Sequence, residues 1–125
     1  MGSDKRKSQR VHTNQLVSYT KFTPEKLVEV MGMANTVDLS EEGMKLTLRD
    51  ALTTGDVIHL DFVLDGKVIK TDATVVHVEE VKHYKIGFQF IPGEGDHALD
   101  PHEADKIREW LQTHTFANKS KDETI

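Results

Sequence analysis

The chain has 125 residues, a formal net charge of −5 and no cysteine, which together exclude a disulfide framework, a thiolate nucleophile and a cysteine-based zinc site. Its length fits one domain of ordinary size. With 37% hydrophobic and 30% charged residues, it is too apolar for a disordered chain and too polar for membrane insertion. The charged start has no apolar signal segment after it, so we expect a cytoplasmic protein.

Positive charge is concentrated at the N-terminus. The segment "DKRKSQRV" gives residues 1–10 a net charge of +3, so the other residues together carry −8. A long nucleic acid needs many neutralised phosphates, and an acidic body would repel it. The sequence therefore favours a small anionic partner over a nucleic acid, and residues 1–12 are predicted to form a flexible basic arm.

Strands are predicted after the arm. Residues 15–22 are rich in strand-forming residues, and residues 26–39 continue after the turn residues Thr23 and Pro24. In residues 43–48, polar residues alternate with Met44, Leu46 and Leu48. This alternation is typical of a half-buried strand.

The clearest hairpin is centred on Asp65 and Gly66, a pair that accepts the left-handed backbone of a tight turn. The strand before it has its hydrophobic residues on one side, at Ile58, Leu60, Phe62 and Leu64. Residues 68–80 and 85–91 form a second pair, and the latter alternates at Ile86, Phe88 and Phe90. About six short strands with this turn spacing predict an antiparallel barrel.

The spacing of hydrophobic residues changes from that of a strand to that of a helix near the C-terminus. Ala104, Ile107 and Leu111 repeat at helical spacing, and Trp110 belongs to the same buried face. The start of the helix carries the capping signals Asp100, Pro101 and Glu103. The prediction is a mainly β fold: a six-stranded antiparallel barrel, split or Greek-key-like, with a C-terminal helix. It spans residues 13–116, and residues 117–125 form a polar tail.

The motif "DLSEEG" follows the second long strand. If the strand continues, Asp38 and Ser40 lie on one face and present two hydrogen-bonding side chains. Gly43 is expected to turn the chain with positive φ and to leave room for a flat group near the backbone. Alone, this combination is also what an ordinary turn contains.

Arg6-x-x-x-Arg10 followed by Asp38-x-Ser40-x-x-Gly43 resembles the PilZ family, as do "NTVDLSEEGMKL", "ATVVHVEE" and "IGFQFI". The similarity covers roughly residues 4–114. PilZ proteins are bacterial receptors for cyclic di-GMP. The resemblance implies that the arm arginines hold phosphate and one guanine, while the Asp-Ser-Gly segment holds another guanine.

This division of roles fits the chemistry of the ligand. A guanidinium forks onto a phosphate or onto the O6/N7 edge of guanine. The Asp38 carboxylate can accept from N1–H and N2–H₂ of guanine, and Ser40 can add a bond. Ordering the arm costs roughly 1 to 2 kcal/mol per residue, so binding and arm ordering are expected to be one event.

Two further residues are assigned by resemblance. Lys5 precedes the first motif arginine, where arginine in related proteins favours a stacked pair of nucleotides. Because lysine lacks the planar fork, we expect one nucleotide per chain. His77 lies at a strand position that often faces the ligand in related sequences, although a plain surface histidine fits as well.

Other functions find less support in the sequence. No metal-ligand spacing or nucleophile motif is present, so we expect no metal, no cofactor and no enzymatic activity. A PilZ-like adaptor that binds proteins without nucleotide would typically lack the arginine motif. A barrel for single-stranded RNA would need exposed aromatic residues for stacking. We therefore expect a cyclic di-GMP receptor that passes its signal to an unidentified protein partner.

Overall fold

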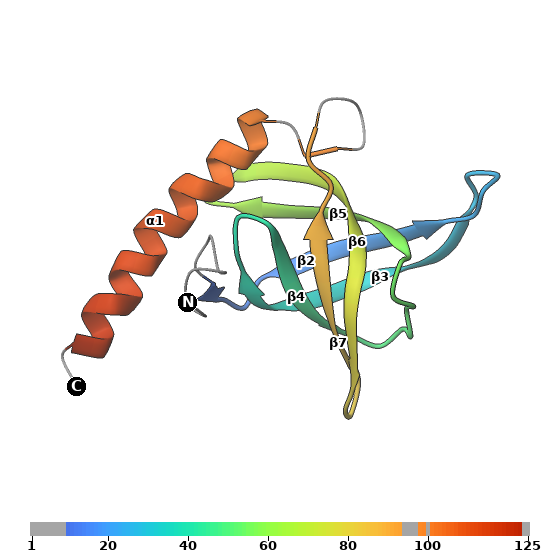
Figure 1. Cartoon of the computed structure of the whole chain (residues 1–125), viewed down its shortest axis with the longest axis horizontal. Helices are drawn as coiled ribbons and strands as arrows, with labels where there is room; N and C mark the ends of the chain where they lie inside the picture. The colour runs from blue at the N-terminus through green and yellow to red at the C-terminus, as the bar shows by residue number, and fades with distance from the viewer. Residues whose placement is uncertain (1–9, 94–97, 100, 124–125) are drawn as a thin grey trace, which may run out of the picture.

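The computed structural model describes residues 10–93, 98–99 and 101–123, with side chains as far as residue 113. Its elements are β1 (Val11–His12), β2 (Leu16–Phe22), β3 (Val28–Leu39), β4 (Gly43–Leu48), β5 (Val57–Leu64), β6 (Lys67–Glu80), β7 (Tyr84–Phe90) and α1 (Pro101–Glu123). Figure 1 shows the strands wrapped into one body with α1 along its side. Within the described residues, no helix combines the length and apolar character that crossing a membrane requires.

The barrel closes because β3 pairs with two different strands along its length. The sheet order is β1-β3-β2-β5-β6-β7-β4, and β3 also pairs with β4. The ring therefore consists of six antiparallel strands, β2 to β7, and the predicted barrel is confirmed. The sequence did not predict β1, a two-residue strand that extends the β2 side of β3.

The predicted hairpin and its register are confirmed. Asp65 and Gly66 join β5 to β6 with φ values of 51° and 78°, and Leu64 pairs with Lys67. Two consecutive residues with positive φ match the right-handed twist of the strands they connect.

The core contains the alternating residues that the sequence placed on one face. Every one of the predicted inward residues of β4, β5 and β7 is buried, and the rings of Phe62 and Phe90 stack with centroids 6.1 Å apart. From α1, the core receives Ile107, Trp110 and Leu111. Trp110 is 5% exposed, as expected of a core residue.

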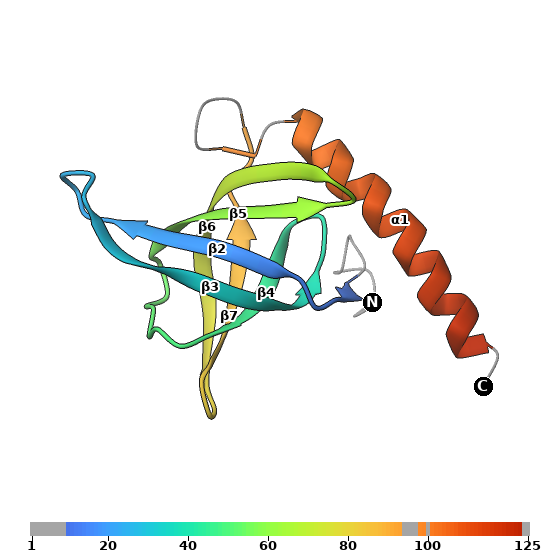
Figure 2. The same cartoon turned by 180° about the vertical axis from the view of Figure 1, so that it is seen from behind.

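Helix α1 begins at Pro101, as predicted, and runs to Glu123. It therefore continues beyond residue 116, into the segment that the sequence assigned to a polar tail. The helix contacts β1 and β5 (Figures 1 and 2). The predicted cap at Asp100 lies outside the described residues.

Candidate functional site

The first contact of the site joins the arm to the barrel. Arg10 directly precedes β1, and its Nη1 donates to Oδ1 of Asp38 at 2.8 Å. The Asp38 side chain is 8% exposed and that of Arg10 is 49% exposed. A nearly buried carboxylate needs such a partner. This contact uses one nitrogen of the guanidinium, which has further N–H groups that can donate to other acceptors.

The motif turn between β3 and β4 is held by Ser40. Its Oγ donates to the Gly43 carbonyl at 3.2 Å and accepts from the N–H groups of Glu42 and Gly43 at 3.3 and 3.2 Å. Its own N–H donates to the same carbonyl at 2.8 Å. Because a hydroxyl has one donor and two acceptor positions, the turn occupies all of them.

Gly43 has a different role from the one expected. The residues with positive φ do not include it, so the prediction of a left-handed turn residue is wrong. A Cβ at this position would lie 1.9 Å from the carbonyl oxygen of Phe88 on β7. Glycine is needed because two backbones approach closely.

Two β-bulges decide which side chains face outward. The register shifts between Thr36 and Asp38 in β3, and between Val75 and His77 in β6. The side chains of Thr36 and Val75 point into the barrel and are buried, and strict alternation would point Asp38 and His77 to the same inner face. The extra residue in each strand reverses the alternation, so that both pair on the outer face. The sequence predicted Asp38 and Ser40 on one face of a continuing strand. Because β3 ends at Leu39, Ser40 lies beyond the strand and this prediction is wrong.

The outer face carries one row of paired residues across five strands. His12 pairs with Asp38, Asp38 with Lys45, Lys45 with Gly87, and Gly87 with His77. Residues directly opposite each other in antiparallel strands share a face. Gly87 has no side chain and leaves a bare stretch of backbone in the middle of the row. A Cβ at this position would lie 3.5 Å from the Cβ of His77, an ordinary contact distance.

This row and Arg10 place two cations beside one carboxylate on an acidic chain. Lys45 and Arg10 are positively charged, Asp38 is the acidic member, and His12 and His77 contribute imidazole rings. Among the described residues, the Lys45 side chain has no ion pair, so its ammonium is available to an anion. The arrangement suits an anionic ligand with a flat group that can rest on Gly87.

Sequence reasoning predicted Arg10, Asp38 and His77 as site residues but not their neighbours in the row, His12, Lys45 and Gly87. Lys45 and Gly87 became visible only through strand pairing, although a glycine inside the apolar strand "IGFQFI" is itself a signal of close approach. The predicted ligand residues Lys5 and Arg6 lie outside the described residues.

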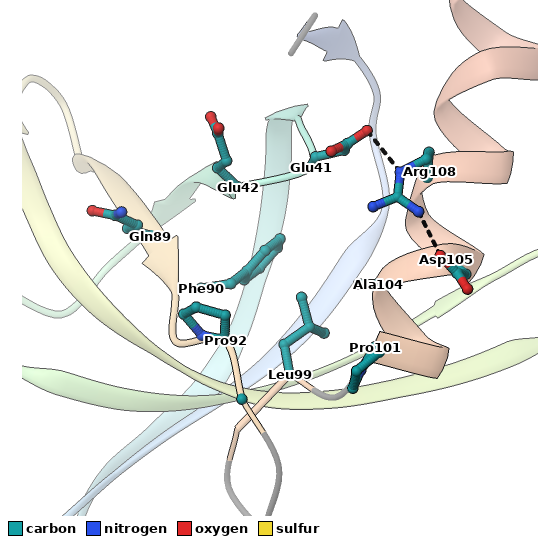
Figure 3. A pocket seen from close by; sticks show the side chains of 11 residues that line it. Glu41, Glu42, Gln89, Phe90, Pro92, Leu99, Pro101, Ala104, Asp105 and Arg108 are labelled. Carbon is teal, nitrogen blue, oxygen red and sulfur yellow. Dashed lines mark hydrogen bonds and ion pairs between the residues drawn. The ribbon is translucent and has the colours of Figure 1, made fainter. Parts of the chain in front are cut away.

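The motif turn also touches helix α1 (Figure 3). Arg108 Nε donates to Glu41 Oε2 at 3.1 Å, and its Nη1 donates to Asp105. The hydrogen bonds to Glu41 and then Asp105 raise the pKa of Arg108. A cavity of about 350 Å³ lies beside them. Its floor is apolar, and its rim holds the acids Glu41, Glu42 and Asp105 together with Arg108, an excess of negative charge that disfavours a phosphate group there.

The described residues contain no group of three or more histidine, cysteine, aspartate or glutamate side chains arranged to hold a metal ion. His59 contacts two carboxylates, with Nδ1 3.0 Å from Asp72 Oδ1 and Nε2 3.1 Å from Asp61 Oδ1. It connects β5 to β6 on the outer face and lies apart from the row of Asp38.

Solved structures share this fold. The PilZ domain with c-di-GMP of YcgR from Escherichia coli superposes with a TM-score of 0.67 at 13% identity, covering 97% of this chain and 99% of that chain. The Bacillus subtilis inhibitor of motility MotI/DgrA has a TM-score of 0.71 at 15% identity, covering 90% of this chain and 52% of its own. The K. pneumonia MrkH–c-di-GMP complex has a TM-score of 0.67 at 16% identity, covering 93% and 55%.

This chain thus spans about half the length of the MotI/DgrA and MrkH chains. No curated protein matches it by sequence. The profile of the PilZ domain matches residues 4–111, which include the whole barrel and the first half of α1. The chain belongs to the PilZ domain family.

Proposed function

We propose that this protein is a receptor for cyclic di-GMP that binds the nucleotide on the outer face of the barrel. The observation that carries the proposal is the cross-strand row in which Asp38, Lys45, Gly87 and His77 lie side by side, with Arg10 bound to Asp38. Two of the structural relatives are solved with cyclic di-GMP. PilZ domains act as receptors, and enzymatic activity is not part of the proposal.

Each residue of the row has a chemical role in the proposal. Arg10 uses one nitrogen on Asp38 and offers the others to a phosphate or to the O6/N7 edge of guanine. The second carboxylate oxygen of Asp38 accepts from N1–H and N2–H₂ of the other guanine. The Lys45 ammonium neutralises a phosphodiester, and the purine rests on Gly87 beside the imidazole of His77.

Ser40 and Gly43 serve as positioning residues. The hydroxyl of Ser40 is fully engaged inside the turn, and Gly43 allows β4 to approach β7. Together they hold β3 and β4 in the register that places Asp38 beside Lys45. A serine in this role is needed for binding without touching the nucleotide.

The arm completes the site in the proposal. Arg6 belongs to the same motif as Arg10, and the three residues between them suffice to bring a second guanidinium over the ligand. Ordering this segment costs roughly 1 to 2 kcal/mol per residue. Nucleotide binding and arm ordering are then one event, which a cytoplasmic partner protein can read.

Isothermal titration calorimetry with cyclic di-GMP and cyclic di-AMP tests the function. The wild-type chain should bind cyclic di-GMP and discriminate against cyclic di-AMP, which presents an amino donor where guanine has O6. Asp38→Ala should lower both the affinity and this discrimination. A flat isotherm for the wild-type chain, or equal binding of the two nucleotides, would contradict the proposal.

The same titration tests the stoichiometry. We propose one nucleotide per chain, because Lys5 offers a single ammonium where an arginine can stack on and fork to a second guanine. Lys5→Arg should then raise the number of nucleotides bound from one toward two. Two nucleotides on the wild-type chain would show that the ammonium suffices.

A further inference from the structure

Strand β3 has a long stretch of free edge. β2 pairs with one side of it from Val28 to Asn35, whereas β4 pairs with the other side only from Asn35 to Leu39. In the part of the chain that the structure describes, no strand pairs with that second side between Val28 and Ala34. Figures 1 and 2 show why: the β2–β3 hairpin projects beyond the rest of the barrel, and β4 leaves it.

The register shows which backbone groups are open. The Thr36 N–H donates to the Gln15 carbonyl on the β2 side. Because the direction of N–H and C=O groups alternates along an antiparallel strand, those of Gly32 also point at β2, and those of Met31 and Met33 point at the free edge. Such a row of unpaired donors and acceptors is a template for another strand.

A hollow lies along this edge. Its volume is about 570 Å³, and its walls are the β3 segment around Met31 and Met33 and the segment from Thr47 to Asp50, with His83 nearby. The side chains of Met31 and Met33 are exposed, at 63% and 58%. Methionine surfaces of this kind adapt to different apolar side chains, so the hollow combines open backbone groups with apolar contact.

The charge of the hollow selects the partner. Arg49 and His83 are exposed in it, and among the described residues Arg49 has no ion-pair partner. The one acid in its lining, Asp50, accepts a hydrogen bond from the Tyr19 hydroxyl. The hollow therefore holds one guanidinium that lacks an ion pair, and this group favours a partner that carries a carboxylate.

We propose that an extended segment of a partner protein adds to the free edge of β3, with alternating apolar side chains over Met31 and Met33 and a carboxylate at Arg49. Backbone hydrogen bonds supply the affinity, and the hollow and Arg49 select the sequence, as in other strand-addition complexes. This surface goes beyond nucleotide binding and does not depend on it.

The full-length chain is titrated, without nucleotide, with a synthetic peptide of alternating valine and threonine that ends in two glutamates. Amide hydrogen exchange by NMR is the readout. With peptide bound, the exchange rate of the Met31 and Met33 N–H groups should fall by about tenfold or more. The exchange rate of the Gly32 N–H, which is already directed at β2, should not change. Unchanged exchange at Met31 and Met33 would overturn the proposal.

Charge variants test the partner's chemistry. Arg49→Glu should weaken binding of the glutamate peptide by about tenfold and strengthen binding of a peptide that ends in two lysines. Lys70→Glu, with the same change of charge three strands away on β6, is the matched control and should have no effect. Equal affinities for both peptides in wild type and Arg49→Glu would contradict the assignment of Arg49.

A second copy of this chain is the other possible occupant. If the edge pairs with itself, protection of the Met31 and Met33 N–H groups will rise with protein concentration in the absence of peptide, together with dimer formation in sedimentation velocity. That result would replace the partner segment by a second copy and refute the proposal. A monomer with open N–H groups supports it.

Discussion

Among single residues, Arg10 is expected to contribute both to stability and to the proposed nucleotide binding. Arg10→Ala leaves the nearly buried Asp38 carboxylate without its cation, so we expect the free energy of unfolding to fall by about 1 to 3 kcal/mol. Affinity for cyclic di-GMP should fall by about 2 to 5 kcal/mol, the usual cost of truncating one partner of a desolvated charge pair. Urea unfolding and calorimetry measure the two effects.

Arg10→Lys is the matched control. It keeps the charge beside Asp38 but not the planar fork, so it should recover most of the stability and little of the affinity. Unaltered nucleotide binding by Arg10→Ala would show that the arm does not contribute through this residue.

Two glycines on neighbouring strands should respond in opposite ways to alanine. In Gly43→Ala the new Cβ meets the Phe88 carbonyl oxygen, which is a backbone atom and cannot move aside. The free energy of unfolding should therefore fall by about 1 to 3 kcal/mol or more. In Gly87→Ala the nearest atom is His77 Cβ at 3.5 Å, an ordinary contact. The barrel should tolerate it, while the methyl group raises the floor of the ligand site and weakens nucleotide binding.

Thermal unfolding and calorimetry on both variants distinguish these roles. A Gly43→Ala protein as stable as wild type would contradict the close approach of β4 and β7. Full nucleotide affinity in Gly87→Ala would place the purine elsewhere on the barrel.

Among the elements, the contact between β2 and the segment after β4 depends on pH. Tyr19 is buried on β2, and its hydroxyl donates to Asp50. Burial, followed by the hydrogen bond and charge of Asp50, raises the pKa of Tyr19 above its ordinary value of 10.0. The folded state therefore favours the protonated phenol, and this contribution to stability is fully present below pH 10 and is lost as the pH rises above it.

Tyr19→Phe should lower the free energy of unfolding by about 1 kcal/mol at pH 8 and remove this part of the decline above pH 10. Urea unfolding between pH 8 and pH 11 measures the slope. Tyr84→Phe, which removes a phenol without touching Asp50, is the control and should retain it. An identical slope in wild type and Tyr19→Phe would show that the Tyr19 phenol does not contribute.

In the whole molecule, ligand binding and arm protection should appear together. If the chain binds as proposed, saturating cyclic di-GMP should stabilise the folded state, by about 2.7 kcal/mol at a hundred times the dissociation constant. We expect a higher unfolding temperature and slower tryptic cleavage at the arm sites, Lys5, Arg6, Lys7 and Arg10.

Asp38→Ala, which would remove the proposed guanine contact while keeping every arm cleavage site, should lose both effects of the nucleotide. Stabilisation of the wild-type barrel without any change in arm cleavage would separate the two events. The arm would then not fold over the nucleotide.

Much of this protein follows from local sequence. The alternation of Ile58, Leu60, Phe62 and Leu64 determines which face of β5 is buried, and Asp65-Gly66 determines where the chain turns, because both depend only on neighbouring residues. The change of period after Pro101 likewise predicts the helix. The family was indicated by the resemblance of two motifs, Arg6-x-x-x-Arg10 and Asp38-x-Ser40-x-x-Gly43, to those of PilZ proteins.

The tertiary structure alone decided how these residues combine. Alternation by itself would have pointed Asp38 and His77 into the barrel. Two bulges, which depend on how β3 and β6 pair with their neighbours, place both side chains on the outer face. Lys45 and Gly87 joined the site through strands far apart in sequence, and Gly43 is a glycine because of the Phe88 carbonyl on another strand. Local patterns cannot encode such contacts, since each is set by the register between distant segments.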